Sequence, residues 1–164
     1  DKRSERQKEG AKEKMKIRVD QIKKLRVQTG AGIADCRRAL QQSGGDLKKA
    51  VVWLQKRGLE KAAKKLDRPT GEGLVESYIH ATGKIGAMVE LSCETDFVAK
   101  NEEFKKLAHE LAMQVAAQNP KNVAELLKQV YIRDEKMTVD DLIKQAIAKF
   151  GENIVIKDFA RLEI

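Results

Sequence analysis

Residues 19–58 carry apolar side chains at the spacing of three short amphipathic helices. The first predicted helix ends at a glycine-containing break over residues 29–32, and its apolar positions are Val19, Ile22, Leu25 and Val27. A second predicted helix starts at Ile33, and Asp46 is a suitable N-cap for a third. Together they predict a three-helix bundle with a thin core. Ile33 either closes that core or lies at the tip of a tight turn between helices.

Two charged segments flank the predicted bundle. Residues 1–18 alternate Lys, Arg and Glu with almost nothing apolar, so they are predicted to be a charged tail without a face to bury. Residues 59–73 are basic and end in a stretch that contains Pro69, Gly71 and Gly73. This composition predicts a linker to a second domain over residues 74–164.

The pattern of the second domain predicts an α+β fold. Two runs rich in β-branched and apolar residues surround a Thr-Gly-Lys turn and predict a hairpin, over residues 74–81 and 85–93. Helical spacing recurs over residues 101–118, 124–129 and 139–150. A last strand is predicted over residues 153–164, with one face formed by Ile154, Ile156, Ala160, Leu162 and Ile164. We expect a small antiparallel sheet with helices on one face.

Residues 94–99 fit this pattern least well. They join the second strand to the long helix, where a polar connection is expected, yet they place Phe97 and Val98 beside Asp96. Phe97 could fold back as a hydrophobic staple before the cap at Asn101. Alternatively, it could be an exposed aromatic anchor for a partner. The spacing favours neither.

The charge of the chain is unevenly distributed. The net charge is +8, with +4 in residues 1–18, +8 in residues 19–68 and −4 in the remainder. A basic excess suggests nucleic acid as a partner, but aromatic residues make up only 4% and none interleaves with the basic cluster as a base-stacking surface requires. An acidic protein is an equally suitable partner. No apolar run approaches the roughly 20 residues of a membrane span, so no membrane association is expected.

The residues typical of catalysis and cofactor binding are poorly represented. His80 and His109 have no nucleophile at a suitable spacing, and neither glycine-rich phosphate-binding motif occurs. Cys36 and Cys93 are isolated, so neither a zinc site nor a disulfide is expected. The acidic pairs at residues 134–135 and 140–141 are interpreted as helix N-termini. We expect no enzymatic activity, no cofactor and no metal site.

Two segments nevertheless resemble the elongation factor Ts family. They are LRVQTGAGIADC at residues 25–36 and CETDFVAK at residues 93–100. KAAKK at residues 61–65 and IAKFGENI at residues 147–154 extend the resemblance over residues 19–164. The resemblance implies an N-terminal bundle like a ubiquitin-associated domain, followed by a core domain.

The resemblance also implies a function, as a guanine-nucleotide exchange factor for elongation factor Tu in its GDP-bound and nucleotide-free states. In this family the Thr-Asp-Phe-Val segment contacts the GTPase domain and promotes loss of its magnesium ion. The matching residues here are Thr95, Asp96, Phe97 and Val98. The family's bundle also contacts that domain, which assigns Leu25, Ile33 and Ala34. The basic residues Lys61, Lys64 and Lys65 could steer an acidic partner.

Compared with the family pattern, the chain is short. Members commonly have a helical hairpin between the segments matching residues 119–123 and 126–129, which here nearly abut, and longer members have a second core half. Resemblance to other short members implies a homodimer. A basic RNA- or ribosome-associated adaptor is the main alternative, and a ubiquitin-type adaptor would leave residues 95–99 unexplained. The expected location is a bacterial-type cytoplasm, with an organellar matrix or stroma as the alternative.

Overall fold

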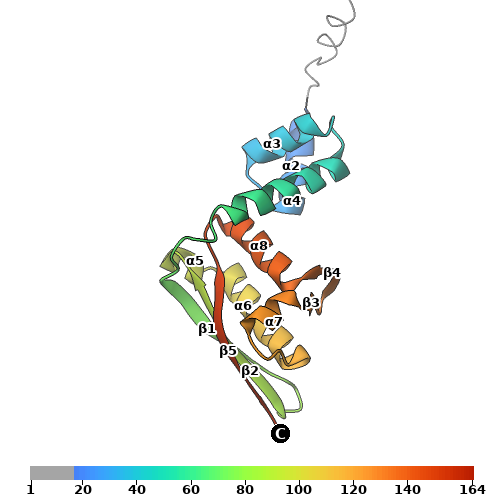
Figure 1. Cartoon of the computed structure of the whole chain (residues 1–164). Helices are drawn as coiled ribbons and strands as arrows, with labels where there is room; N and C mark the ends of the chain where they lie inside the picture. The colour runs from blue at the N-terminus through green and yellow to red at the C-terminus, as the bar shows by residue number, and fades with distance from the viewer. Residues whose placement is uncertain (1–16) are drawn as a thin grey trace, which may run out of the picture. The chain divides into compact units, whose positions relative to one another are not determined.

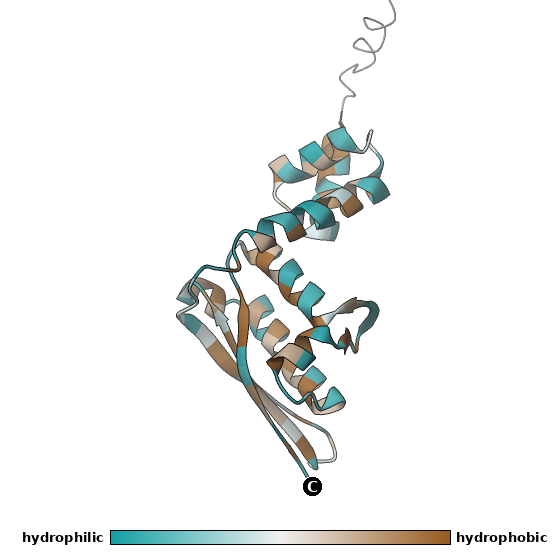
Figure 2. Ribbon diagram, viewed as in Figure 1, coloured by the Kyte–Doolittle hydropathy of each residue, from teal (hydrophilic) through white to brown (hydrophobic). Residues whose placement is uncertain are grey.

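The computed structural model describes residues 17–164, which divide into two compact units over residues 17–57 and 58–164 (Figure 1). Of the predicted charged tail, only Ile17 and Arg18 belong to the described residues. In both units the helices alternate hydrophilic and hydrophobic segments along the ribbon (Figure 2). Within residues 17–164, no helix is long and apolar enough to cross a membrane.

The first unit contains α2 (Val19–Thr29), α3 (Ile33–Gln42) and the start of α4 (Leu47–Ala63). Gly30 ends α2 with a φ of 68°, and its N–H donates to the carbonyl of Arg26. This left-handed conformation suits glycine, which has no Cβ. The buried core consists of Leu25, Cys36, Ala39, Leu40 and Ala50. The three predicted helices are confirmed, and most of the residues that they bury are small.

Helix α4 is longer than the pattern predicted. Residues 59–63, which were expected to begin a linker, continue the helix to Ala63. Ala62 is fully buried in the core of the second unit, so this turn of α4 has an apolar contact to hold it. Lys65, just beyond α4, donates through Nζ to the carbonyl of Gly151 at 2.5 Å. The burial of Ala62 and the Lys65 hydrogen bond both depend on residues far away in the sequence. The local spacing of apolar residues therefore could not reveal that α4 continues to Ala63.

The second unit is the predicted antiparallel sheet with helices on one face (Figure 1). The sheet has the order β1 (Glu72–Ile79), β2 (Ile85–Cys93) and β5 (Val155–Glu163). Its helices are α5 (Asp96–Ala99), α6 (Glu102–Gln118), α7 (Val123–Lys128) and α8 (Val139–Phe150). Phe104 and Leu111 of α6 are fully buried in one core with Val89 of β2.

A bulge reverses the faces of β5 halfway along the strand. Leu91 pairs with Ile156, but its neighbour Glu90 pairs with Asp158, so Lys157 is an extra residue. Beyond it, Phe159 packs against the core, whereas Leu162 is 80% exposed. The predicted common face was therefore wrong for its last three members, which lie on the outer face of the sheet: Ala160, Leu162 and Ile164.

The structure contains a second, two-stranded sheet that the pattern did not predict. It pairs β3 (Val130–Tyr131) with β4 (Asp134–Thr138), and buried Gln114 of α6 bonds to the backbone of Val130 and Ile132. Two residues are too few to show a strand period. The interpretation of residues 134–135 as a helix N-terminus was therefore wrong, whereas Asp141 does form a capping box with Thr138 at the start of α8.

Candidate functional site

Phe97 is presented to solvent on the short helix α5. Its side chain is 87% exposed, while Val98 packs against the core and Ala99 is buried. The staple alternative was therefore wrong, because the ring covers nothing in the second unit. Residues 96–99 are also helical and not an irregular loop. The short helix therefore presents Asp96 and Phe97 to solvent and is held on the core by Val98 and Ala99.

The N-terminal end of α5 is held by Glu152, which follows α8. The Glu152 carboxylate accepts hydrogen bonds from the backbone N–H of Glu94 at 3.1 Å and of Thr95 at 3.0 Å, and from the Thr95 hydroxyl at 2.6 Å. In return, the Glu94 carboxylate accepts from the N–H of Asn153 at 2.7 Å. The buried Asn153 amide donates to the carbonyls of Leu66 and Arg68. Segments far apart in the chain therefore meet beneath α5.

The charges around α5 are arranged in pairs. Lys100 Nζ lies 2.7 Å from the Asp96 carboxylate, and this hydrogen bond lowers the pKa of Asp96 below its usual range. Glu94 pairs with Arg68 at 3.6 Å. Burial raises the pKa of the Cys93 thiol, and the nearby charge of Glu152 adds to this rise. The thiol is therefore protonated at neutral pH and donates to the carbonyl of Thr95 at 3.1 Å.

In the first unit, the three residues assigned to partner binding occupy different environments. Ile33 is 58% exposed and Ala34 is also exposed, but Leu25 is fully buried in the bundle core. Near this end of α2, Val27 is an exposed apolar residue, with 88% of its surface accessible. Residues two positions apart point to different sides of a helix, so Leu25 and Val27 cannot share a face. This geometric rule could have separated the two from sequence alone.

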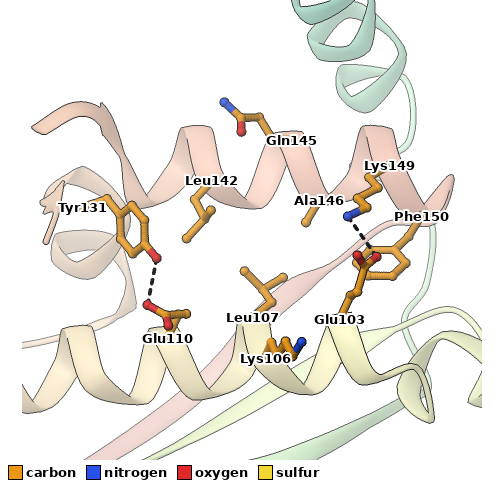
Figure 3. Close-up of a pocket in the computed structure, with 10 residues that line it drawn as sticks. All are labelled: Glu103, Lys106, Leu107, Glu110, Tyr131, Leu142, Gln145, Ala146, Lys149 and Phe150. Atoms are coloured by element: carbon orange, nitrogen blue, oxygen red, sulfur yellow. Dashed lines mark hydrogen bonds and ion pairs between the residues drawn. The ribbon is translucent and has the colours of Figure 1, made fainter. Parts of the chain in front are cut away.

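A surface pocket of about 240 Å³ lies between α6 and α8 in the second unit (Figure 3). The Tyr131 hydroxyl donates to Glu110 at 2.9 Å, and Lys149 pairs with Glu103 at 2.9 Å. Burial, with the neighbouring Glu110 carboxylate, raises the pKa of Tyr131 to about 12, so the phenol remains protonated. These charged and phenolic groups bond to one another across the pocket and form no arrangement of nucleophile and base.

The two histidines lie at the surface of the second unit, and each is hydrogen-bonded to a neighbouring side chain. The Nδ1 atom of His80 is 3.0 Å from the Tyr78 hydroxyl, and that of His109 is 3.4 Å from Glu76. In the part of the chain that the structure describes, no group of three or more His, Cys, Asp or Glu residues could hold a metal ion. The α5 segment is therefore the strongest candidate for a functional surface.

Comparison with known proteins agrees with the sequence resemblance. Residues 94–164 match a family model described as elongation factor TS. The chain is 42% identical to elongation factor Ts of Nitratidesulfovibrio vulgaris over 195 residues, covering 92% of this chain and 98% of the relative. Elongation factor Ts of Oleidesulfovibrio alaskensis is 43% identical over 193 residues, covering 90% and 98%. For the protein of the same name from Rippkaea orientalis, the identity is 42% and the coverage 88% and 77%.

The relatives contain residues that this chain lacks. The alignment with the Nitratidesulfovibrio protein spans 195 residues, more than the 164 of the whole chain. Here the connection after α6 is direct, because Asn122 caps α7 only a few residues beyond Gln118.

Proposed function

The chain belongs to the elongation factor Ts family, and on this basis we propose that it is a guanine-nucleotide exchange factor that promotes GDP release from elongation factor Tu. The observation that carries the proposal is the exposed Phe97 ring on a segment that matches the family's Thr-Asp-Phe-Val motif. We place this action in the cytoplasm of a bacterium, in keeping with the relatives. The role is one of binding and requires no reactive group on this chain.

Exchange of this kind depends on coupled binding. This chain binds nucleotide-free elongation factor Tu more tightly than the GDP-bound form. Because the coupling is reciprocal, bound GDP weakens the affinity for this chain by the same ratio as this chain weakens the affinity for GDP. Accelerating release about 10⁴-fold requires a barrier lower by about 5.5 kcal/mol. Complete burial of one Phe side chain supplies only about 1.5 to 3 kcal/mol. Phe97 therefore needs a second contact surface to reach such an acceleration.

Within the Thr95–Val98 segment, we assign direct contact with the partner to Phe97 and Asp96. Phe97 is the exposed apolar group, and Asp96 carries a charge next to it. We propose that inserting this pair near the bound magnesium ion of elongation factor Tu promotes loss of the ion. Val98 packs against the core and the Thr95 hydroxyl is bonded to Glu152, so these two support the contact from within.

The second contact surface that we propose is the exposed end of the bundle around Ile33 and Ala34. Val27 adds apolar area at the end of α2, and Leu25 supports this end from inside the core. Residues 17–57 contain ten basic and three acidic side chains, so this unit would be attracted to an acidic partner. A protein partner fits these exposed apolar residues better than RNA does, because RNA recognition favours aromatic stacking.

The test is a nucleotide-release assay. Elongation factor Tu loaded with a fluorescent GDP analogue is mixed with excess unlabelled GDP, with and without this chain. A release rate that rises with the concentration of the chain and then saturates is the expected result. No acceleration, together with RNA binding that weakens steeply with salt, would favour the adaptor alternative instead.

We also propose that the chain forms a homodimer through the outer face of the three-stranded sheet. This face carries exposed apolar side chains from all three strands, namely Val75, Ile79, Met88 and Leu162, and Ile164 lies just beyond β5. Ile79 and Leu162 flank Gly86 in one cross-strand row, where the Ile79 side chain covers the glycine. Exposed apolar side chains such as Ile79, Met88 and Leu162 in neighbouring rows are typical of an interaction surface, and resemblance to short family members favours a second copy as its occupant.

Light scattering after size exclusion tests the dimer. The wild-type chain is expected to elute with twice its monomer mass, and Leu162→Glu should convert it to monomer by placing a charge in the apolar face. Val52→Glu is the matched control, because Val52 is an exposed valine in the first unit. A monomeric wild type at micromolar concentration, or a dimer unaffected by Leu162→Glu, would refute this proposal.

A further inference from the structure

Thr95 precedes helix α5 in the N-cap position but does not cap it. Threonine side chains in this position commonly accept a hydrogen bond from the first turn of the helix, yet the structure shows no such side-chain bond. The Thr95 hydroxyl instead donates to Glu152, which is 57 positions away in the chain. The side chain therefore serves a long-range contact and not the local helix.

Glu152 is well placed to hold the start of α5. One carboxylate oxygen accepts from two consecutive backbone N–H groups, those of Glu94 and Thr95, and the other accepts from the Thr95 hydroxyl. Gly151, directly before it, ends α8 in the left-handed conformation. Its carbonyl accepts from Lys65 Nζ, so the backbone that carries Glu152 is itself anchored.

We propose that Glu152 is a positioning residue for nucleotide exchange, which orients Phe97 by fixing the backbone on its N-terminal side; this inference rests on the exchange function proposed above. Val98 and Ala99 anchor the C-terminal side of the ring in the core. A helix of four residues cannot maintain its own geometry, because helix formation requires a costly nucleus. Glu152 fixes the backbone before Phe97, as Val98 and Ala99 fix the backbone after it. The Phe97 backbone is therefore held on both sides while its ring remains exposed.

The contacts suggest a set of matched variants. Glu152→Met removes both acceptor oxygens at similar size, and Thr95→Val removes only the hydroxyl. Glu152→Gln retains the arrangement, because its amide oxygen can accept from the two N–H groups while its NH₂ donates to the Thr95 hydroxyl. Thr95→Ser keeps the hydroxyl donor. Lys144→Met is the structural control, since it removes an ion pair with Asp140 within α8 and leaves Thr95 and Glu152 intact.

Two measurements separate positioning from general stability. The first is the GDP-release rate of elongation factor Tu, resolved into the maximal rate and the concentration of chain that gives half of it. The second is the fluorine NMR spectrum of the free chain with 4-fluorophenylalanine at position 97, which reports the order of the ring without any partner. Thermal unfolding of each variant shows that it remains folded.

We expect Glu152→Met to lower the maximal rate about tenfold, less than the roughly hundredfold loss that a misplacement of 1 Å can cause. The half-saturating concentration should change little, and the fluorine resonance should shift or broaden. Thr95→Val should show a smaller loss, and the double variant should be no slower than Glu152→Met, because both substitutions remove the same bond. Glu152→Gln, Thr95→Ser and Lys144→Met should remain near the wild type.

Three results would overturn the inference. They are a wild-type maximal rate in folded Glu152→Met, an unchanged fluorine spectrum in that variant, and an equal loss of rate in Lys144→Met. If the wild-type chain itself fails to accelerate release, the proposed exchange function is wrong. The fluorine spectrum still decides whether Glu152 orders Phe97, so the two failures are distinguishable.

Discussion

The two units differ in the size of the core beneath their exposed apolar residues and in their charge. Residues 17–57 bury a core of five mostly small residues and carry ten basic against three acidic side chains. Residues 58–164 contain sixteen basic and eighteen acidic side chains, and α6 packs Phe104 and Leu111 against the sheet. The exposed residue Phe97 belongs to the unit with the larger core, whereas the exposed residues Ile33 and Val27 belong to the unit with the smaller core. The difference suggests that the first unit attracts the partner and the second presents a rigid anchor to it.

Truncating the larger core should have the greatest effect. Phe104 is fully buried and stacks edge-to-face with Phe150 at a ring-centroid distance of 6.0 Å. Phe104→Ala should lower the free energy of unfolding of the second unit by about 3 to 5 kcal/mol. Chemical denaturation followed by circular dichroism measures this loss. A loss below about 1 kcal/mol, the level of a surface change, would contradict the assigned core.

The corresponding truncation in the bundle tests whether the two units are independent. Leu25 is fully buried, so Leu25→Ala should cost about 2 to 5 kcal/mol and unfold the thin bundle first. Amide hydrogen exchange should show lost protection in residues 19–57 and unchanged protection in the sheet. Val27→Ala is the control, since its side chain is exposed. Equal loss of protection in both units would show that they fold as one.

Phe97 should be important for the function of the second unit but not for the stability of that unit. Phe97→Ala is expected to slow GDP release at least about tenfold, which corresponds to 1.4 kcal/mol of barrier. Its cost in unfolding free energy should stay under about 1 kcal/mol, because the ring is exposed. Exchange kinetics and thermal melting measure the two effects. A strongly lowered melting temperature, or unchanged exchange, would remove Phe97 from the contact surface.

A smaller effect is expected at the exposed end of the bundle. Ile33→Ala removes three side-chain carbons from the proposed contact. Because Ile33 is only 58% exposed in the free chain, a partner can newly bury only about half of their surface, so the half-saturating concentration should rise by up to about tenfold, with little change in the maximal rate. This pattern is the opposite of the one expected for Phe97. Val52→Ala, at another exposed position of the same unit, serves as the control. A lowered maximal rate would mean that the bundle takes part in nucleotide release itself.

The smallest effect is that of salt on the attraction between the basic bundle and its partner. Raising the salt concentration from ~50 mM to ~300 mM should increase the half-saturating concentration by a few-fold, because exposed charges are screened. The maximal rate should stay nearly constant, since Phe97 acts through apolar contact. Titrations of the chain at several salt concentrations measure both. A maximal rate that falls steeply with salt would assign the chemistry of release to charged groups.

The sequence alone was sufficient for elements whose signals are local. Helical spacing identified α2, α3, α6 and α8, and the cap at Asn101 lies where predicted. The hairpin of β1 and β2 was equally clear from its turn and its period of two. The residues of the Thr-Asp-Phe-Val segment were also found by sequence, although their roles remain proposals.

Only the tertiary structure decided features that depend on contacts between distant residues. The bulge at Lys157 changes which side of β5 faces the core, and Gln114 of α6 bonds to the backbone of Val130 and Ile132 next to the small sheet. The Thr95 hydroxyl and Glu152 are 57 positions apart in the chain, so only the tertiary structure brings them together. Local patterns specify the preference of each segment. The identity of the partner for a hydrogen bond or an apolar face is determined when the segments meet.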